Sequence, residues 1–143
     1  MDTIMTEHAH AAAGHPGGHP GRALGNHAAR TLPDGSPKCR LIAWEVTRSC
    51  NLACRHCRAE AHPEPSTAEA KALIDTFPQV GDPIVIFTGG DPMMRPDVYE
   101  LGAYATAKGL RCVMSPNGTL ITPENARRIK EAGFQRCSIS IDG

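Results

Sequence analysis

From residue 41 onward, short apolar runs alternate with segments that carry helix signals, and this order is the strongest constraint on the fold. The apolar runs predict strands at residues 41–47, 84–88, 111–115 and 136–141. Helices are predicted at residues 66–77, at residues 96–108 and between Thr122-Pro123 and Gly133. Three strand–helix units followed by a strand predict a parallel α/β sheet, in an open doubly wound fold or in part of a β/α barrel.

The first part of the chain, residues 1–37, has a different composition from the rest. It holds five of the seven histidines, together with a run of glycine and proline around His15 and His19. Such a segment has too little apolar surface to fold, so we predict a disordered His/Gly/Pro-rich tail. Its imidazoles suit transient binding of nickel, zinc or iron, and they suit a solvated linker equally well.

Residues 38–143 are predicted to form the folded region. A barrel of only four strands would leave its inner face and both edges open. We therefore expect these residues to be the N-terminal portion of a larger core, and the chain to be a fragment.

The charge of the chain is balanced, with 15 Lys and Arg against 15 Asp and Glu. This balance gives no reason to expect nucleic acid or an anionic membrane as a partner. No apolar run approaches the roughly 20 residues that span a bilayer, and residues 1–30 lack the pattern of a secretory signal. We therefore expect a cytoplasmic protein.

Three of the six cysteines, Cys50, Cys54 and Cys57, lie within one short stretch after the first predicted strand. Thiolates are soft ligands that select iron–sulfur clusters, zinc or copper(I). A four-iron cluster takes four ligands, so three local cysteines would leave one iron open to a small molecule. The alternative is a structural zinc site completed by His56 or His62, although such sites usually have a second pair of cysteines.

A second candidate motif, Thr88-Gly89-Gly90-Asp91-Pro92, follows the second predicted strand. Ligands of parallel α/β folds bind at the carboxyl ends of strands, and glycines there expose the backbone to a close ligand. The other polar candidates at strand ends are Ser115, Asn117, Ser140 and Asp142. All of these residues and the cysteine cluster are expected on one rim of the sheet.

The C-x3-C-x2-C cluster followed by Gly-Gly-Asp-Pro resembles the radical S-adenosylmethionine (SAM) superfamily over about residues 39–143. The resemblance implies a partial (β/α)6 barrel, of which these residues are the N-terminal part. It implies that Cys50, Cys54 and Cys57 ligate a [4Fe–4S] cluster whose fourth iron is chelated by SAM. Electron transfer from the cluster to SAM would then generate a 5′-deoxyadenosyl radical.

The same resemblance implies which residues bind SAM. Gly89, Gly90 and Asp91 match the segment that contacts the methionine amine, with Asp91 where the family often has Glu. His56 holds the aromatic position that meets the adenine. The strand-end positions that often touch the cofactor are Ser115, Asn117, Ser140 and Asp142.

The stretches on either side of Cys50 and after Phe87 are most similar to the branch of the superfamily that acts in heme synthesis. That branch implies oxidative decarboxylation of iron-coproporphyrin III propionates to vinyl groups, with flavodoxin or ferredoxin as electron donor. Related members act in heme d1 synthesis, siroheme-derivative deacetylation or peptide modification. A non-catalytic zinc- or nickel-binding module is the alternative of another class. The fragment alone is expected to be inactive.

Four further residues receive structural interpretations. Cys39 is expected to be a bystander of the cysteine cluster, and Cys112 and Cys137 are expected to be small buried hydrophobes in strands. Glu45 either points into the mouth of the barrel or pairs with a nearby arginine.

Overall fold

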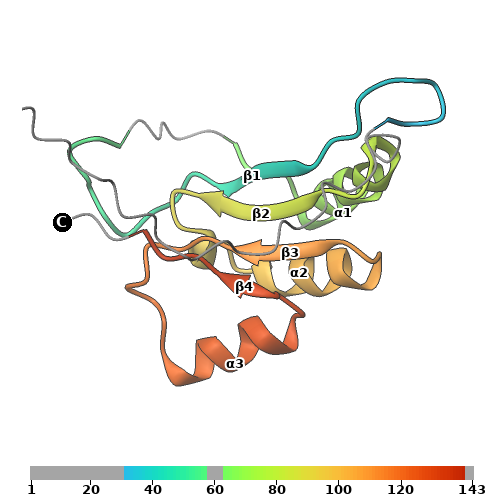
Figure 1. Ribbon diagram of the computed structural model, residues 1–143. Helices are drawn as coiled ribbons and strands as arrows, with labels where there is room; N and C mark the ends of the chain where they lie inside the picture. The colour runs from blue at the N-terminus through green and yellow to red at the C-terminus, as the bar shows by residue number, and fades with distance from the viewer. Residues whose placement is uncertain (1–30, 58–62, 141–143) are drawn as a thin grey trace, which may run out of the picture.

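The computed structural model describes residues 31–57 and 63–140, and these residues form a four-stranded parallel sheet with helices between successive strands (Figure 1). The strands are β1 (Leu41–Thr47), β2 (Ile84–Gly89), β3 (Arg111–Met114) and β4 (Arg136–Cys137). They lie in the order β1-β2-β3-β4. The predicted parallel α/β sheet is therefore confirmed.

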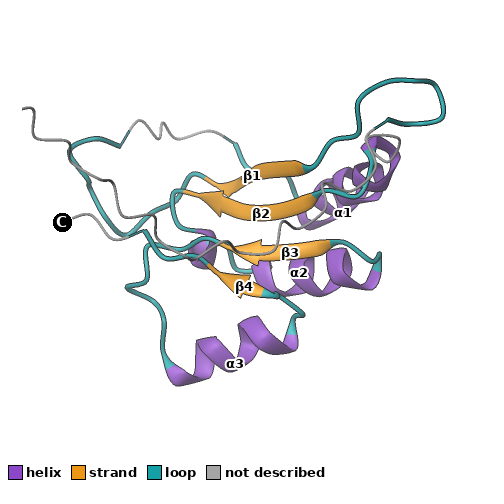
Figure 2. Cartoon of the chain, in the orientation of Figure 1, coloured by secondary structure: helices purple, strands orange, loops and turns teal. Residues whose placement is uncertain are grey.

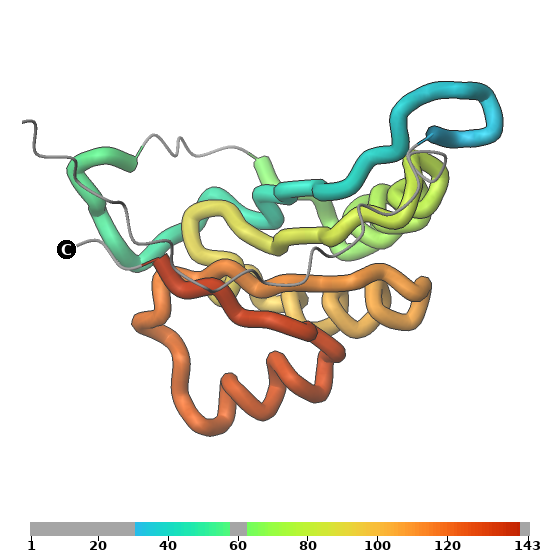
Figure 3. Tube along the Cα trace, viewed as in Figure 1, coloured from blue at the N-terminus to red at the C-terminus, as the bar shows by residue number. Residues whose placement is uncertain are grey.

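Each crossover between neighbouring strands contains one α-helix (Figure 2). These helices are α1 (Thr67–Thr76), α2 (Val98–Ala107) and α3 (Pro123–Glu131). Two short 3-10 helices, η2 (Phe77–Val80) and η3 (Pro92–Met94), complete the connections. The cysteine loop, which begins at Arg48 and carries the three clustered cysteines, leaves the carboxyl end of β1, the end from which the turns after β2 and β3 also leave (Figure 3).

Local capping explains two of the helix starts. The Ser66 side chain accepts from the backbone N–H of Glu69, whose carboxylate bonds back to the backbone N–H of Ser66, so the predicted capping box is present. Thr122 caps α3 in the predicted way. Helix α2, however, begins at Val98 rather than at Pro96, because Asp97 occupies the N-cap position.

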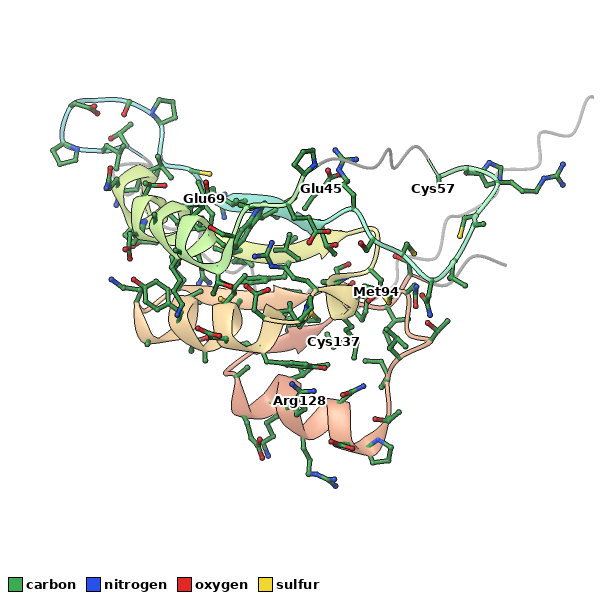
Figure 4. All side chains as sticks on the ribbon, turned by 180° about the vertical axis from the view of Figure 1, so that it is seen from behind. Glu45, Cys57, Glu69, Met94, Arg128 and Cys137 are labelled. Atoms are coloured by element: carbon green, nitrogen blue, oxygen red, sulfur yellow. The ribbon has the colours of Figure 1, made fainter. Side chains whose placement is uncertain are left out.

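Aromatic contacts link β1 to β2, and β2 to the segment between α3 and β4. The Trp44 ring lies 5.4 Å from the Phe87 ring, and the Phe87 ring lies 5.1 Å from the Phe134 ring. The Phe87–Phe134 pair is edge-to-face, and such contacts add to the hydrophobic stabilisation of a core. Arg128 of α3 covers the ring of Tyr99 of α2 at 4.0 Å, which fixes the last helix against its neighbour (Figure 4).

No helix of the described residues covers the other face of the sheet. A hollow of about 480 Å³ lies over it, lined by strand residues that include Ile84, Ile86 and Val113. Cys137 lines the same hollow and is exposed, so the prediction that it would be buried is wrong, whereas Cys112 faces the helices and is fully buried. Strand β4 stops at Cys137, short of the predicted residue 141, at the edge of the sheet.

Some predictions concern residues near or beyond the limits of the described structure. Residues 1–30 of the predicted tail lie outside it, and residues 31–37 form a turn closed by a bridge between Thr31 and Pro37. Glu45 forms an ion pair with Arg48 at 2.7 Å, so the interpretation that it pairs with a nearby arginine is confirmed. No helix in the described parts of the chain is long and apolar enough to span a membrane.

Candidate functional site

The guanidinium of Arg95 joins the two ends of the cysteine loop. It donates to the carbonyl of Val46 at 2.8 Å, before the loop, and to the carbonyl of Pro65 at 2.9 Å, near the end of the loop. Its remaining donors bind the Asp97 carboxylate at 2.7 and 3.0 Å. The Arg95 side chain is only 3% exposed, so water screens these bonds little. The buried guanidinium of Arg95 therefore holds the two ends of the cysteine loop together.

A second contact across the base of the loop comes from Glu64. Its carboxylate accepts from the hydroxyl of Thr47, from the backbone N–H of Arg48 at 3.3 Å and from the hydroxyl of Ser49 at 3.4 Å. The residues that lead into Cys50 are thus held against a residue near the end of the same loop. Sequence reasoning missed Glu64 and Arg95, because their partners are distant in sequence or are backbone groups.

Gly89 and Gly90 bring β2 against the chain that leads to Cys50. The N–H of Gly90 donates to the carbonyl of Thr47 at 3.0 Å, and the N–H of Asp91 donates to the carbonyl of Ser49 at 2.8 Å. A Cβ on Gly90 would overlap the carbonyl of Ser49, and one on Gly89, whose φ is +139°, would overlap the carbonyl of Thr47. Only glycine permits this approach at both positions.

Asp91 is fully buried, and its carboxylate links two of the rim turns. One oxygen accepts from the N–H of Met93 at 2.8 Å, within its own turn, and the other accepts from the N–H of Asn117 at 2.7 Å, after β3. The negative charge is stabilised by these two backbone donors. Asp91 therefore sets the position of the turn after β3 relative to the turn after β2.

The side chain of Asn117 reaches the beginning of the cysteine cluster. Its Nδ2 donates to Asn51 Oδ1 at 2.8 Å and to Cys50 Sγ at 3.7 Å. Asn51 in turn donates to Thr119 Oγ1 at 2.8 Å. Sequence reasoning missed Asn51 and Thr119, although both flank motifs that were recognised.

The three clustered cysteines differ in exposure. Cys50 is half-buried beside Asn117, whereas Cys54 and Cys57 are exposed on a turn in which the N–H of Cys57 donates to the carbonyl of Cys54 at 3.0 Å. In Figure 4, Cys57 lies out on the loop, away from the sheet. Within residues 31–57 and 63–140, no three His, Cys, Asp or Glu side chains come together as a metal-binding group.

The remaining predicted site residues are less tightly connected to this centre. Ser115 is half-buried and lines the hollow, with its N–H bonded to the carbonyl of Phe87 at 2.9 Å. His56 and Ser140 are exposed, while His62 and Asp142 lie outside the described residues. Although Cys137 is exposed, partial desolvation of its thiol by the surrounding residues raises the pKa, and the negative charge of Asp91 raises it further.

The sequence of residues 44–143, more than half of the chain, matches the model of the Radical SAM superfamily. The chain belongs to this superfamily. The superfamily's cofactors, a [4Fe–4S] cluster and SAM, are therefore the cofactors of this chain. The donor set agrees, because three thiols after the first strand are soft ligands that leave a fourth iron position open.

Several relatives are named AdoMet-dependent heme synthase, and two of them share at least 70% identity with this chain. The chain is 80% identical to the one from Nitratidesulfovibrio vulgaris, over 82% of this chain and 33% of the relative. It is 70% identical to the one from Oleidesulfovibrio alaskensis, over 90% of this chain and 36% of the relative. A Methanosarcina barkeri protein named Fe-coproporphyrin III synthase is 44% identical, over 88% of this chain and 32% of the relative. The chain thus spans about a third of the length of these curated relatives.

The fold is also similar to that of a solved structure. The crystal structure of BtrN in complex with AdoMet and 2-DOIA superposes with a TM-score of 0.64 at 20% identity. The match covers 71% of this chain and 45% of BtrN, and it shows that the two chains share this part of the fold.

Proposed function

We propose that this chain is the cluster- and SAM-binding part of an enzyme that converts two propionates of iron-coproporphyrin III to vinyl groups. The observation that carries the proposal is the 80% and 70% identity to two proteins named AdoMet-dependent heme synthase. This identity extends over a stretch that contains the cysteine loop, the Gly-Gly-Asp turn and the turn with Asn117.

In this proposal Cys50, Cys54 and Cys57 hold the [4Fe–4S] cluster. When bound, the cluster and SAM supply a carbon radical able to abstract hydrogen from an unactivated C–H bond. The exposure of Cys54 and Cys57 fits a loop that gathers around its cluster as the cluster binds, since metal binding and local folding are coupled. Arg95 and Glu64 hold the base of that loop in place.

The Gly-Gly-Asp turn and neighbouring rim residues are proposed to hold SAM. Gly89 and Gly90 let the carboxyl end of β2 pack against the chain that leads to Cys50, and Asp91 fixes the turn through buried bonds. His56 is proposed to lie at the adenine. The other proposed cofactor contacts are Ser115, Asn117, Ser140 and Asp142.

The reaction removes one hydrogen atom, one carbon dioxide and one electron from each propionate, and the electron passes to a one-electron acceptor. A flavodoxin or ferredoxin is the proposed source of the electron that reduces the cluster, and the cytoplasm is the proposed compartment. The enzyme must hold each propionate close to the radical and keep water away, as radical chemistry requires.

The test is an anaerobic turnover assay with the full-length protein, iron-coproporphyrin III, SAM and a strong reductant. Mass spectrometry is expected to show product lighter by two formic acid units, and the Cys54→Ala variant is expected to form none. Unchanged porphyrin in the presence of an intact cluster would contradict the substrate assignment.

The second candidate is synthesis of iron-coproporphyrin III rather than its consumption, because one relative at 44% identity is named Fe-coproporphyrin III synthase. The higher identity to the two heme synthases favours the first candidate. The same assay separates them, because in the second case the added iron-coproporphyrin III is not consumed.

A further inference from the structure

We propose that Asn117 is a positioning residue that acts through Cys50: its amide hydrogen-bonds to the Cys50 sulfur and raises the reduction potential of the cluster. The inference rests on the proposed ligation of the cluster by Cys50. It deepens that proposal by assigning one of the residues outside the cysteine motif a role in setting the cluster's electron affinity.

The orientation of the Asn117 amide is fixed by its partners. Its Oδ1 accepts from the backbone N–H of Thr119 at 2.9 Å and from the Thr119 hydroxyl at 2.7 Å. Because a backbone N–H can only donate, the oxygen must face Thr119 and the nitrogen must face the cysteine loop. The Nδ2 group therefore presents its hydrogens to Asn51 Oδ1 at 2.8 Å and to Cys50 Sγ at 3.7 Å.

This set of partners uses the whole hydrogen-bonding capacity of the amide. An Asn side chain has two N–H donors and two acceptor lone pairs. Both donors are directed to the cysteine loop, and both lone pairs are directed to Thr119. The Asn117 side chain is therefore directed to Cys50 and its neighbours, which supports an effect on the sulfur of that cluster ligand.

The backbone of Asn117 is equally well anchored. Its N–H donates to the carboxylate of Asp91 at 2.7 Å, and Asp91 is fully buried between the turns after β2 and β3. The position of the amide is thus set by the sheet rather than by the exposed part of the cysteine loop. Among the contacts described for the three clustered cysteines, the Asn117 amide contacts the sulfur of Cys50, which is half-buried.

A hydrogen bond to a ligating sulfur withdraws negative charge from it. Reduction adds negative charge to the cluster, so the bond stabilises the reduced state more than the oxidised state and raises the potential. Removing the N–H donor is therefore expected to lower the potential and make the cluster harder to reduce.

The test compares Asn117→Leu with wild-type full-length protein after anaerobic reconstitution. Iron and sulfide per chain measure cluster content, and a redox titration followed by electron paramagnetic resonance gives the midpoint potential. The matched control is Asn125→Leu, which removes an amide that donates to the Leu120 carbonyl at 2.8 Å, also in the connection between β3 and β4. We expect a lower potential in Asn117→Leu and the wild-type potential in Asn125→Leu.

A second variant covers the case in which Asn117→Leu holds no cluster. Asn117→Asp keeps the shape of the side chain and its bonds from Thr119 but removes the N–H donor, and it is also expected to lower the potential. A wild-type potential in whichever Asn117 variant holds a cluster would overturn this inference and would leave the proposed function standing. Failure of the wild-type protein to bind any cluster would overturn the proposed function, and the inference with it.

Discussion

The carboxylate of Asp91 accepts a hydrogen bond of 2.7 Å from the backbone N–H of Asn117, and this bond fastens the turn after β2 to the turn after β3. The other oxygen of the same carboxylate accepts from Met93. The buried Asp91 carboxylate, which belongs to the proposed SAM-binding turn, thus also holds together the turns after β2 and β3.

Replacing Asp91 by Asn is expected to destabilise the fold. One oxygen becomes an NH2 group that faces a backbone N–H donor, and a buried donor left without an acceptor costs about 1–3 kcal/mol. Urea unfolding followed by circular dichroism measures the loss. Asp82→Asn is the control, because the Asp82 side chain is 91% exposed. Equal midpoints for both variants would show that the two bonds contribute little.

Replacing Gly90 by Ala is expected to displace the cysteine loop and reduce cluster content. The new Cβ would lie 2.6 Å from the carbonyl oxygen of Arg48 and would overlap that of Ser49. Gly109→Ala is the control, because Gly109 has a φ of +82° but no other group within 4 Å of an added Cβ. Iron content after reconstitution should fall in the first variant and stay near wild type in the second. A full complement of iron in Gly90→Ala would mean that the loop tolerates the shift.

The order of elements could be predicted because local signals determine it. The alternation of apolar runs, the capping box at Ser66 and Glu69, and the start of α3 at Thr122 are all readable within a few residues. The exposure of Cys137 could not be predicted, because it depends on the face of an edge strand that the helices leave open.

The candidate site was only partly predictable for a similar reason. The cysteines and glycines stand in recognisable spacings, whereas Arg95, Glu64 and Asn51 act through partners elsewhere in the chain. No periodicity marks a polar residue that bonds to a distant carbonyl. Their roles emerge only once the sheet has placed the turns side by side.

Replacing Arg95 by Met is expected to destabilise the protein by about 3 kcal/mol, because it leaves the largely buried Asp97 carboxylate and two loop carbonyls without their donor. Lys71→Met is the control. It breaks an exposed pair with Glu100, and exposed ion pairs are weakened by water. Thermal unfolding should separate the two variants clearly. A loss no larger than that of Lys71→Met would contradict the role of Arg95 as the clamp of the loop.

The stability of the fold is expected to decrease in acid through Asp97. Burial raises the pKa of the Asp97 carboxyl, but hydrogen bonds from Arg95 and Thr67 and the charge of Arg95 outweigh it and lower the pKa below its usual value. A lowered pKa in the folded state stabilises the fold above the unfolded-state pKa of about 3.9. This contribution is lost as the pH falls through the folded-state pKa.

The comparison of wild type with Asp97→Asn checks this prediction. The difference in the free energy of unfolding should be full near neutral pH and should shrink below about pH 4. A difference that stayed constant down to pH 3 would show that ionisation of Asp97 does not contribute.

The most direct test of the central claim is anaerobic reconstitution of the full-length protein with iron and sulfide, followed by reduction and electron paramagnetic resonance with and without SAM. The account predicts a [4Fe–4S] signal that changes on addition of SAM and that is absent from Cys54→Ala. Cys39→Ser should retain it, because the seven residues of β1, about 23 Å long, separate Cys39 from the cysteine loop. A protein that holds zinc instead, or a cluster signal indifferent to SAM, would contradict the account.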